Sequence, residues 1–423
     1  MDERDEREGG EPEAKEPADE AVARPVPTPY PRPRPAPAPP RRSRLRAVGR
    51  GTVRTVVALL SVVALAATGY AYTTLDDLQD NVQTTDALQQ NVDDEDPDTP
   101  PPPPQDDGAT DILLVGADSR NDMQGNPLPL SMLKELRTED KAGVNTDTLI
   151  VLRIPKNGGK PTGISIPRDT WVDVPQGGKG KINSAYGAAK VAESQRLRAE
   201  GMTDHARVER DSDQAGRRAL VRTVQDFTQV RIDHYAEINL LGFYLLTESL
   251  GGVEVCLNAP TVDKDSGADF AAGPQVVSGG EALSFVRQRK NLPRGDLDRI
   301  VRQQVFLSSA LNQVLSAGTL TNSERLGQLT ETLRRSLVLD PGLNLLGFAE
   351  QAKGIANGDM EFVTIPVEQV GARSQDGQSI VTVDLGEVRG FVDDLAKRDQ
   401  QQPSGGGSAP AAAPMRATAP CVN

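Results

Sequence analysis

The chain has 423 residues and a net charge of −13, but this acidity is spread unevenly. Residues 76–107 carry 11 acidic side chains and no Lys or Arg, and residues 1–54 carry 12 basic and 10 acidic ones, so the part after residue 107 keeps only −4 of the total. A nearly neutral folded part has no broad basic field, which argues against specific nucleic-acid binding.

The first 54 residues are predicted to form a disordered tail. Ten acids precede position 21, a run rich in Pro and Arg extends from Arg24 to Arg50, and no apolar periodicity interrupts them. A segment of this composition cannot bury enough apolar surface to offset the entropy of ordering.

Residues 55–75 are predicted to be a transmembrane signal anchor. The stretch contains no charged residue, and as a helix at about 1.5 Å per residue it would extend roughly 30 Å, the hydrocarbon thickness of a bilayer. Arginines precede it and aspartates follow it, so the N-terminus is expected in the cytoplasm and the remainder outside the cell. A cleaved signal peptide is the alternative, because small residues such as Ala64 and Ala67 lie in the run; the long preceding tail favours an uncleaved anchor. Residues 76–108, acidic and ending in prolines, then form a stiff linker.

The two cysteines, Cys256 and Cys421, are therefore expected on the outer side, where thiols can be oxidised. They are either joined in a disulfide that ties the C-terminal tail to the domain or left as two free thiols. The chain has only two histidines, which disfavours a thiol and imidazole zinc site. It also lacks the GxSxG motif of a serine hydrolase.

Three short apolar runs, residues 111–116, 149–154 and 162–166, predict buried strands. If they form an antiparallel meander, the end of the first, the start of the second and the end of the third lie at one edge of the sheet. Asp118, Asp147 and Arg168 would then meet. Each is by itself a common turn or strand-end residue, so their shared edge is the informative feature.

The remaining pattern interleaves strands with helices. Strands are predicted over residues 235–238, 253–257, 362–365 and 380–383, and helices over 130–137, 181–200, 214–229, 240–250, 281–286, 300–315, 323–339, 343–355 and 386–398. Residues 201–213 are predicted to be a charged loop. The pattern indicates one three-layer α/β/α domain, residues 109–400, with a mixed central sheet, followed by a low-complexity tail over 401–423.

The stretch 285–307 concentrates basic residues. Between positions 287 and 303 two acids accompany six basic residues, namely Arg287, Arg289, Lys290, Arg294, Arg299 and Arg302. So many like charges favour a bound anion, with a solvated basic helix as the alternative. Gly295-Asp296 before an apolar periodic run predicts a helix that starts near Asp296.

Helical spacing then sets which of these side chains share a face. Asp296, Arg299 and Gln303 would share one, and Asp298 could pair with Arg302 on the next. Arg287 and Arg289 share a side only if their segment leaves the preceding helix and runs extended.

This combination of residues predicts phosphoryl chemistry. Two converging carboxylates without histidine suit Mg²⁺, which takes oxygen ligands and completes its shell with water or phosphate oxygens. Guanidinium groups match phosphate oxygens and stay charged. Together they can position a phosphoryl group and neutralise its charge. A membrane anchor narrows the substrate to one reachable from the outer membrane face, and a lipid-linked pyrophosphate fits.

The chain resembles the LytR-CpsA-Psr family in several motifs that occur in order between about residues 110 and 315. They are GADSR at 116–120, TDT at 146–148, SIPRDT at 165–170, KINSAY at 181–186, GGVEV at 251–255, FVRQR at 285–289 and DLDRIVRQQ at 296–304. The resemblance implies an α/β/α fold that binds a polyprenyl pyrophosphate. It also implies transfer of a lipid-linked glycopolymer, such as teichoic acid or another secondary wall polysaccharide, onto peptidoglycan.

The resemblance also implies a role for each matching residue. Asp118 and Asp147 would hold Mg²⁺, with Mn²⁺ as an alternative. The catalytic set would be Asp296, Arg287 and Arg299, with Asp296 as base or orienting group for a muramic-acid hydroxyl. The pyrophosphate would also be bound by Arg120, Arg168, Lys181, Arg289 and Gln303.

Two insertions, residues 121–143 and 201–213, depart from the family pattern and bear on metal geometry and acceptor fit. The apolar helix over 240–250 is either a wall of the lipid tunnel or ordinary core.

Three other functions compete with the transferase. A lipid-pyrophosphate hydrolase would use water in place of the sugar hydroxyl. A membrane-bound transcriptional attenuator needs DNA contact, yet residues 1–54 contain no helix-turn-helix pattern. A non-catalytic wall-binding module would bind glycan without depending on a metal.

Overall fold

The computed structural model describes residues 82–89, 107–138, 145–175, 177–314, 327–328, 331–332, 336–343, 348, 360–401 and 420–423. The chain divides into two compact units, residues 1–61 and 62–423, and all described residues belong to the second. The predicted tail 1–54 and anchor 55–75 lie outside the described residues, as do most of the predicted helices 323–339 and 343–355. Within the described ranges, no helix combines the length and apolarity needed to cross a bilayer.

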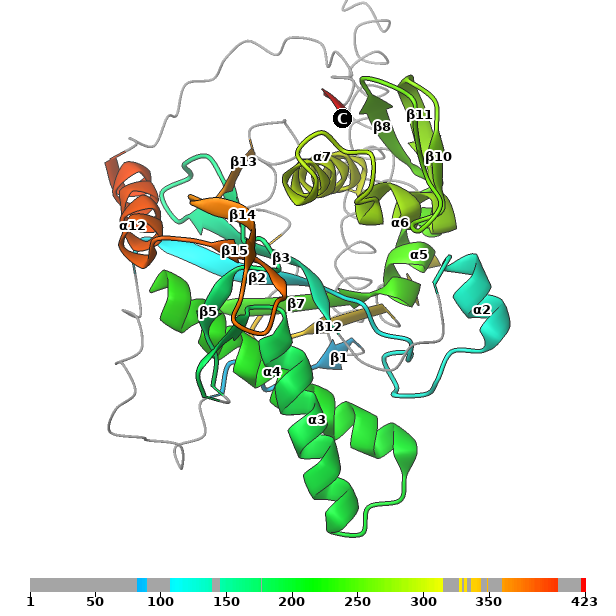
Figure 1. Ribbon diagram of the computed structural model, residues 1–423, viewed down its shortest axis with the longest axis vertical. Coiled ribbons are helices and arrows are strands. Elements are labelled where there is room, and N and C mark those ends of the chain that lie inside the picture. The colour runs from blue at the N-terminus through cyan, green and yellow to red at the C-terminus, as the bar shows by residue number, and fades with distance from the viewer. Residues whose placement is uncertain are drawn as a thin grey trace, which may run out of the picture. The chain divides into compact units, whose positions relative to one another are not determined.

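A mixed sheet of seven strands lies at the centre of the described part (Figure 1). Its order is β1 (Gln83–Thr84), β12 (Leu337–Leu339), β7 (His234–Asn239), β2 (Ala109–Ala117), β3 (Thr146–Pro155), β4 (Thr162–Ser165) and β13 (Glu361–Thr364). Strands β2, β3 and β4 form an antiparallel meander, whereas β7 joins β2 and β13 joins β4 in parallel. The predicted meander and the mixed α/β fold are confirmed.

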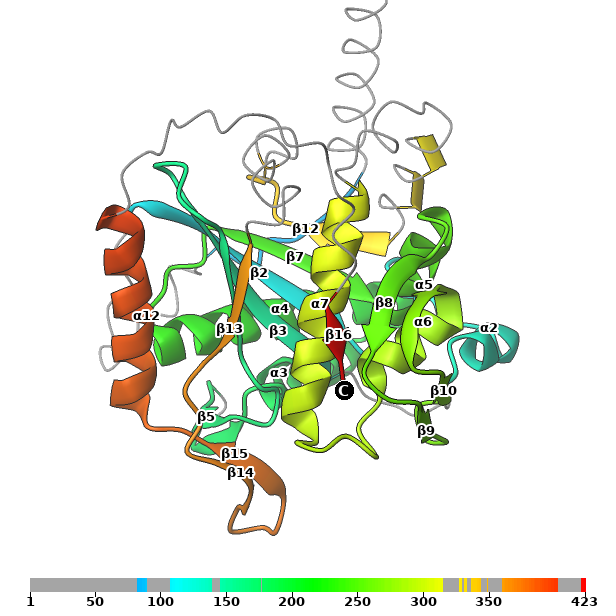
Figure 2. The ribbon, with the colours of Figure 1, turned by 90° about the horizontal axis from the view of Figure 1, so that it is seen from above.

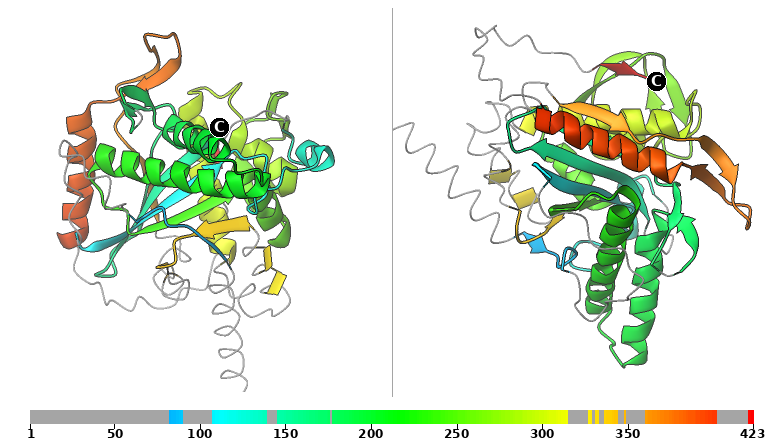
Figure 3. Two further views of the ribbon diagram at one scale, coloured as in Figure 1. Left: turned by 90° about the horizontal axis from the view of Figure 1, so that it is seen from below. Right: turned by 90° about the vertical axis from the view of Figure 1, so that its left-hand side faces the viewer.

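Helices cover both faces of this sheet, which is why its central strands are apolar on both sides. Leu113 of β2 packs with Leu220 and Val224 of α4 (His205–Thr228). On the opposite face, Ile112 of β2 belongs to a second cluster, against which Leu311 of α7 (Asp296–Val314) packs. Figures 1 and 2 show α4 and α7 on opposite sides of the sheet. Helix α3 (Ser184–Ala199) lies along α4, and α12 (Leu385–Gln401) also packs against α4 (Figure 3).

A second packing unit sits beyond α7 and has its own apolar cluster. It comprises α5 (Leu240–Ser249), β8 (Val253–Leu257), β9 (Thr261–Asp263), β10 (Ala268–Phe270), β11 (Gly273–Val277), α6 (Gly279–Arg287) and β16 (Cys421–Val422). Phe285 of α6 and Phe306 of α7 lie in that cluster, so the unit holds α6 against α7. Strand β16 pairs in parallel with β8, and a disulfide joins Cys256 to Cys421. Of the two alternatives for the cysteines, the structure has the bridged one.

Two short hairpins complete the surroundings of the sheet edge. One joins β5 (Trp171–Asp173) to β6 (Lys179–Lys181), and the other joins β14 (Gln369–Arg373) to β15 (Ser379–Thr382). They meet where the main-chain N–H of Val381 in β15 donates to the main-chain oxygen of Asp169, just before β5, at 2.9 Å. The second hairpin therefore comes to lie beside the ends of β3 and β4.

Part of the predicted linker 76–108 belongs to the fold, because residues 83–84 form β1 and Ala87 is buried in the cluster of Leu113. Two predicted elements are also wrong. The charged loop predicted over 201–213 is helical from His205 onward, because Asp204 caps α4 by accepting from Arg207 N at 3.1 Å. Its charges hide an amphipathic pattern in which Val208 and Ser212 are buried. At the end of the predicted helix 323–339, residues 337–339 form strand β12 because they pair with β7. By contrast, the predicted helix over 130–137 is confirmed as α2 (Leu130–Glu135).

Candidate active site

A cavity of about 640 Å³ opens at the edge of the sheet where β2 ends and β3 begins. Its walls come from these strand ends, the turn after β4, the end of α6, the start of α7 and the β14–β15 hairpin. The charged and polar residues that line it are Asp118, Asp147, Arg168, Asp169, Asp263, Asp265, Ser266, Arg287, Arg289, Lys290, Asp296, Arg299 and Ser379. Six segments far apart in the sequence thus meet in one place, and among them are the three strand ends that the strand-edge argument brings together.

A β-bulge between β2 and β3 lies at Asp118 and Asp147, the two aspartates predicted to bind a metal. Gly116 pairs with Thr148 and Ala117 with Thr146, so Asp147 is the extra residue on β3. The N–H of Asp118 donates to Asn145 O at 2.8 Å, which holds the end of β2 against the start of β3. Bulges of this kind redirect a side chain next to a site. Both aspartates consequently line the cavity.

These two carboxylates fit a divalent cation that is shared with a ligand. Asp118 Oδ1 is buried and has no hydrogen-bond partner, while its Oδ2 lies 3.0 Å from Arg120 Nη1. Across the described ranges, no group of three His, Cys, Asp or Glu residues is placed to hold a metal. Mg²⁺ commonly takes one or two carboxylates and fills its other positions with water and phosphate oxygens. The donor set therefore suits Mg²⁺ bound together with a phosphate better than a metal held by protein alone.

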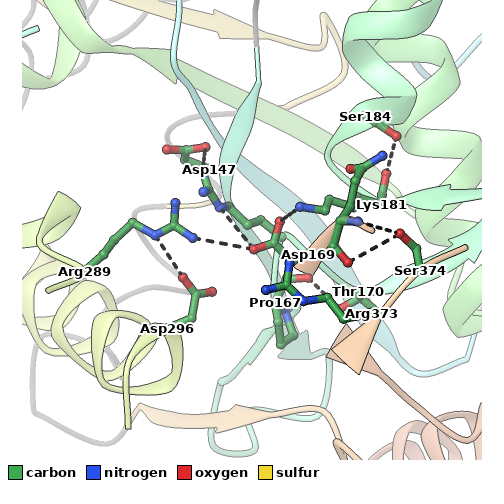
Figure 4. A network of polar contacts seen from close by, with 12 residues as sticks. Asp147, Pro167, Asp169, Thr170, Lys181, Ser184, Arg289, Asp296, Arg373 and Ser374 are labelled. Carbon is green, nitrogen blue, oxygen red and sulfur yellow. Dashed lines mark hydrogen bonds and ion pairs between the residues drawn. The ribbon is translucent and has the colours of Figure 1, made fainter. Parts of the chain in front are cut away.

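Arg168 follows β4 and links the aspartates to the rest of the cavity. Its Nη1 donates to Asp147 Oδ1, and its Nε lies 3.9 Å from Asp169 Oδ2. Burial alone would lower the pKa of Arg168, but the charges of Asp147 and Asp169 raise it above its usual value. Lys181 Nζ lies 3.0 Å from Asp169 Oδ1 (Figure 4). Asp169 thus holds Lys181 next to the cavity.

The segment after α6 turns as predicted for Arg287 and Arg289. Helix α6 ends at Arg287, and Gln288 adopts φ −55° and ψ 134°, so the chain runs extended there. Both arginines line the cavity. Figure 4 shows Arg289 between two carboxylates; its Nη2 is 3.7 Å from Asp169 Oδ2 and its Nε is 3.7 Å from Asp296 Oδ1.

Helix α7 begins at Asp296, where the sequence predicts, after Gly295 with φ +56°. Arg299 is 2% exposed, and its Nη2 lies 2.9 Å from Asp296 Oδ1. Burial lowers the pKa of Arg299 although Asp296 opposes this effect. A buried guanidinium that lines a cavity is suited to an anionic ligand.

The predicted pairing of Asp298 with Arg302 does not form. Asp298 instead accepts from Arg294 Nε at 2.7 Å, and Arg302 donates to Gln288 Oε1 at 2.7 Å. The reason is the turn before α7, which folds Arg294 back over the first helical turn and leaves Arg302 facing the segment after α6.

Three predicted binding residues lie near the cavity without lining it. Arg120 pairs with Asp118 and donates to Asp118 O at 2.6 Å and to Thr138 Oγ1 at 3.3 Å. Lys181 is held by Asp169, and Gln303 donates to Val286 O at 3.2 Å. Their part in ligand binding stays a prediction.

Sequence reasoning missed Asp169, Asp263, Asp265 and Ser266 as residues of this cavity. Asp169 stands next to Arg168, so its place in the same turn was the available signal. Asp263 ends a strand of three residues and Asp265 lies just after it, and such short strands give no periodic pattern that would place them.

Comparison with known proteins identifies the family. Residues 66–397 match the model of the LytR_cpsA_psr family, and the chain belongs to this family. It is 42% identical over 361 residues to the cell wall biosynthesis protein LcpA of Corynebacterium glutamicum, a match covering 85% of this chain and 68% of LcpA.

Two further relatives match a smaller part of the chain. The match to the probable cell wall biosynthesis protein LcpB of the same organism is 36% identical and covers 54% of this chain and 47% of LcpB. The match to the polyisoprenyl-teichoic acid–peptidoglycan teichoic acid transferase TagU of Oceanobacillus iheyensis is 29% identical and covers 56% of this chain and 61% of TagU. This chain therefore spans less than two thirds of LcpB and of TagU.

Solved structures resemble the chain more distantly. Bacillus subtilis TagV gives a TM-score of 0.48 at 21% identity, over 71% of this chain and 100% of TagV. A LytR-Csp2A-Psr enzyme from Actinomyces oris gives a TM-score of 0.45 at 19% identity, over 69% and 90% of the two chains. Likenesses of this extent carry no functional conclusion.

Proposed function

We propose that this protein transfers a glycopolymer from a polyprenyl pyrophosphate carrier onto peptidoglycan. The polymer class would be a teichoic acid or another secondary wall polysaccharide. The family membership supports this proposal, because the family includes proteins named for cell wall biosynthesis and for teichoic acid transfer to peptidoglycan.

The observation that carries the proposal is the convergence of two aspartates and four arginines in one cavity. Asp118, Asp147 and Arg168 come from strand ends, whereas Arg287, Arg289 and Arg299 come from the α6–α7 region. A pyrophosphate needs several cations at once, and guanidinium groups supply them in a geometry that matches phosphate oxygens. Lys290 adds a fifth cation to this cavity, which six aspartates also line.

Asp118 and Asp147 would hold a Mg²⁺ ion, or Mn²⁺ in its place. When bound, the cation would neutralise phosphate charge and polarise the phosphoryl group. The buried Asp118 Oδ1, which has no hydrogen-bond partner, is the oxygen best placed to accept it.

Ligand entry would exchange ion-pair partners. Arg168 is paired with Asp147, and Arg299 with Asp296. A pyrophosphate could take over Arg168 while the cation takes over Asp147, so the charge on each group stays compensated. Such an exchange avoids the penalty of leaving a desolvated charge without a partner.

In the transfer step, an acceptor hydroxyl oxygen forms a bond to the phosphorus that carries the glycopolymer. The bond from that phosphorus to the bridging oxygen breaks, and the lipid leaves with its phosphate. The hydroxyl proton passes to Asp296, or Asp296 orients the hydroxyl for attack. Arg287, Arg289 and Arg299 would stabilise the charge that develops on the phosphoryl oxygens.

The proposed place of action is the outer face of the cell membrane. Residues 55–75 would anchor the chain with its N-terminus in the cytoplasm and the domain outside. The Cys256–Cys421 disulfide is compatible with that side, because structural disulfides persist in oxidising surroundings. Cleavage of the domain by protease added to intact spheroplasts is the expected result; protection from the protease would refute this topology.

The transfer reaction can be tested on the purified chain in detergent. The donor is a synthetic polyprenyl pyrophosphate bearing a short labelled glycan, the acceptor is peptidoglycan, and the readout is label bound to the wall. Arg287→Ala should abolish labelling, whereas Arg196→Ala should not, because Arg196 is exposed on α3 and pairs with Glu193 and Glu200 of the same helix region.

Three outcomes would contradict the proposal or a part of it. Full labelling by Arg287→Ala would show that Arg287 is not needed for the transfer. Release of glycan phosphate at the same rate with and without peptidoglycan would indicate the hydrolase in place of the transferase. Labelling that persists after chelation of divalent ions would exclude the proposed metal dependence.

A further inference from the structure

Helix α6 ends at Arg287, and the segment that follows it, which belongs to no helix or strand, brings Arg289 to the same cavity. Between them, Gln288 is 0% exposed and faces away from the cavity. Its Nε2 donates to Thr261 Oγ1 at 2.6 Å and to Lys290 O at 2.9 Å, and its Oε1 accepts from Arg302 Nη1 at 2.7 Å. One buried amide thus ties the segment to β9, to itself and to α7.

Arg302 is the second part of this arrangement. It lies on α7 one turn after Arg299, is 0% exposed and does not line the cavity. Besides Gln288, its Nε donates to the main-chain oxygen of Asn423, and its guanidinium stands 5.1 Å from the centre of the Phe285 ring. Burial lowers the pKa of Arg302 to about 10, an effect that the charge of Asp298 opposes.

Burying a cation is costly even where it is hydrogen-bonded, and an apolar side chain of similar volume is often more stabilising. The contribution of Arg302 is therefore better sought in what its hydrogen bonds position. They connect α7 with the segment of Arg287 and Arg289 on one side and with the C-terminal residues on the other.

The C-terminal residues are fixed independently of Arg302. The Cys256–Cys421 disulfide and the β8–β16 pairing hold the strand. In addition, Asn258 N donates to Val422 O at 2.8 Å, and Asn258 Nδ2 donates to Asn423 Oδ1 at 3.1 Å. Figure 2 shows β16 lying between α7 and β8. The acceptor that Asn423 presents to Arg302 is therefore held rigidly.

We propose that Gln288 and Arg302 are positioning residues that set Arg287 and Arg289 for pyrophosphate, and that strand β16, held by the disulfide, completes the clamp. Neither residue touches the ligand. These positioning roles depend on one part of the proposed function, namely that the cavity binds a pyrophosphate. Asp263 supports the same segment, because its Oδ2 lies 3.3 Å from the main-chain nitrogens of Arg289 and Lys290.

The test measures binding of inorganic pyrophosphate to the full chain in detergent by titration calorimetry. Gln288→Leu and Arg302→Met should each weaken binding about ten- to a hundredfold, the effect typical of residues that orient ligand-contacting groups. Because both residues act through one chain of contacts, the double variant should bind no more weakly than the weaker single variant.

A matched control separates positioning from stability. Leu311→Ala alters the same helix where Leu311 packs against the cluster on the central sheet, away from the segment after α6. It should lower the melting temperature and leave pyrophosphate affinity unchanged. Cys256→Ser with Cys421→Ser should weaken affinity in the same direction as Arg302→Met, by a smaller factor, because strand pairing still holds β16.

The outcomes distinguish the two proposals. Failure of the wild-type chain to bind pyrophosphate would overturn the proposed function. Wild-type binding together with unchanged affinity in Gln288→Leu and Arg302→Met would overturn the positioning roles alone. Should Gln288→Leu not fold, Thr261→Val decides, since it removes one acceptor of the Gln288 amide at nearly constant volume: severalfold weaker binding supports the proposal, and wild-type affinity refutes it.

Discussion

The ion pair between Arg168 and Asp147 makes an unusual prediction, namely that removing a site carboxylate strengthens anion binding when no metal is present. The two side chains are 14% and 25% exposed, so the pair is partly desolvated. A hydrogen bond to a charged group contributes about 1.5–3 kcal/mol, and solvent exposure places this one near the lower end. Asp147→Asn should release about 1.5 kcal/mol of competition for Arg168, which is a gain of about tenfold in pyrophosphate affinity.

In the presence of Mg²⁺ the sign should reverse. The variant has lost one of the two carboxylates proposed to hold the cation, so Mg²⁺ should no longer enhance pyrophosphate binding as it does in the wild type. Binding couplings of this kind are reciprocal, so pyrophosphate should also cease to tighten Mg²⁺ binding. The measurement is a titration with pyrophosphate in the absence and presence of Mg²⁺, and a titration with Mg²⁺ in the absence and presence of pyrophosphate.

The control for net charge is Asp173→Asn, which removes one carboxylate from an exposed position on β5. An equal gain in affinity in this control would show that overall charge, not the Arg168 pair, sets pyrophosphate binding. Weaker binding by Asp147→Asn in the absence of metal would refute the idea that the aspartate competes with the ligand for Arg168.

Three further predictions concern single features. Arg299→Met should reduce pyrophosphate affinity by about a hundredfold while leaving the melting temperature unchanged or higher, because it removes a buried cation whose pKa burial already lowers; a matching loss of stability would count against this reasoning. Burial raises the pKa of Glu237, but the charge and hydrogen bonds of Arg217 more than offset this and leave it below its usual value. As the pH drops below about 4.3, Glu237 therefore takes up a proton more readily in the unfolded chain than in the folded one. The contribution of Glu237 to the free energy of unfolding decreases over that range. Denaturation by urea should find Glu237→Gln less stable at pH 7 by about 3–5 kcal/mol and less sensitive to acid. Reduction of the disulfide, which closes a loop with a sequence separation of 165, should lower the free energy of unfolding by about 4–5 kcal/mol in the same assay.

The sequence predicted the sheet edge well because strand patterns are local. Each of the runs before Asp118, around Asp147 and before Arg168 is apolar enough to be recognised alone, and an antiparallel meander leaves one arrangement of their ends. The start of α7 was equally local, since Gly295 and Asp296 are a recognisable helix beginning. What the sequence could not show was the bulge that makes Asp147 the extra residue on β3, because a bulge depends on the register between two strands.

The wrong predictions have a common physical origin in partners that lie far away in sequence. The charges of residues 205–213 indicate a loop, but in the structure these residues belong to α4, which packs against α3. There, Lys190 Nζ of α3 lies 2.7 Å from Asp213 Oδ1. Arg302 looks like the natural partner of Asp298 at helical spacing, yet Gln288 and Asn423 compete for its hydrogen bonds. The spacing of residues along a helix determines which side-chain pairs can form, and the tertiary packing determines which of them do form.

The two halves of the cavity rest on different hydrophobic clusters, and this division has a mechanistic consequence. Asp118, Asp147 and Arg168 are carried by strands whose side chains pack into the cores on the two faces of the central sheet. Arg287 and Arg299 are carried by α6 and α7, which pack through Phe285 and Phe306 in a separate cluster. Helix α7 also packs on the sheet through Leu311, and its Gln304 donates to Ser165 Oγ at 2.8 Å, so the two units are joined along this helix. The ion pairs of Asp169 and Asp296 with Arg289 join the two halves across the cavity. A pyrophosphate bound to both halves would replace those pairs, so ligand binding itself would fix the spacing that phosphoryl transfer requires.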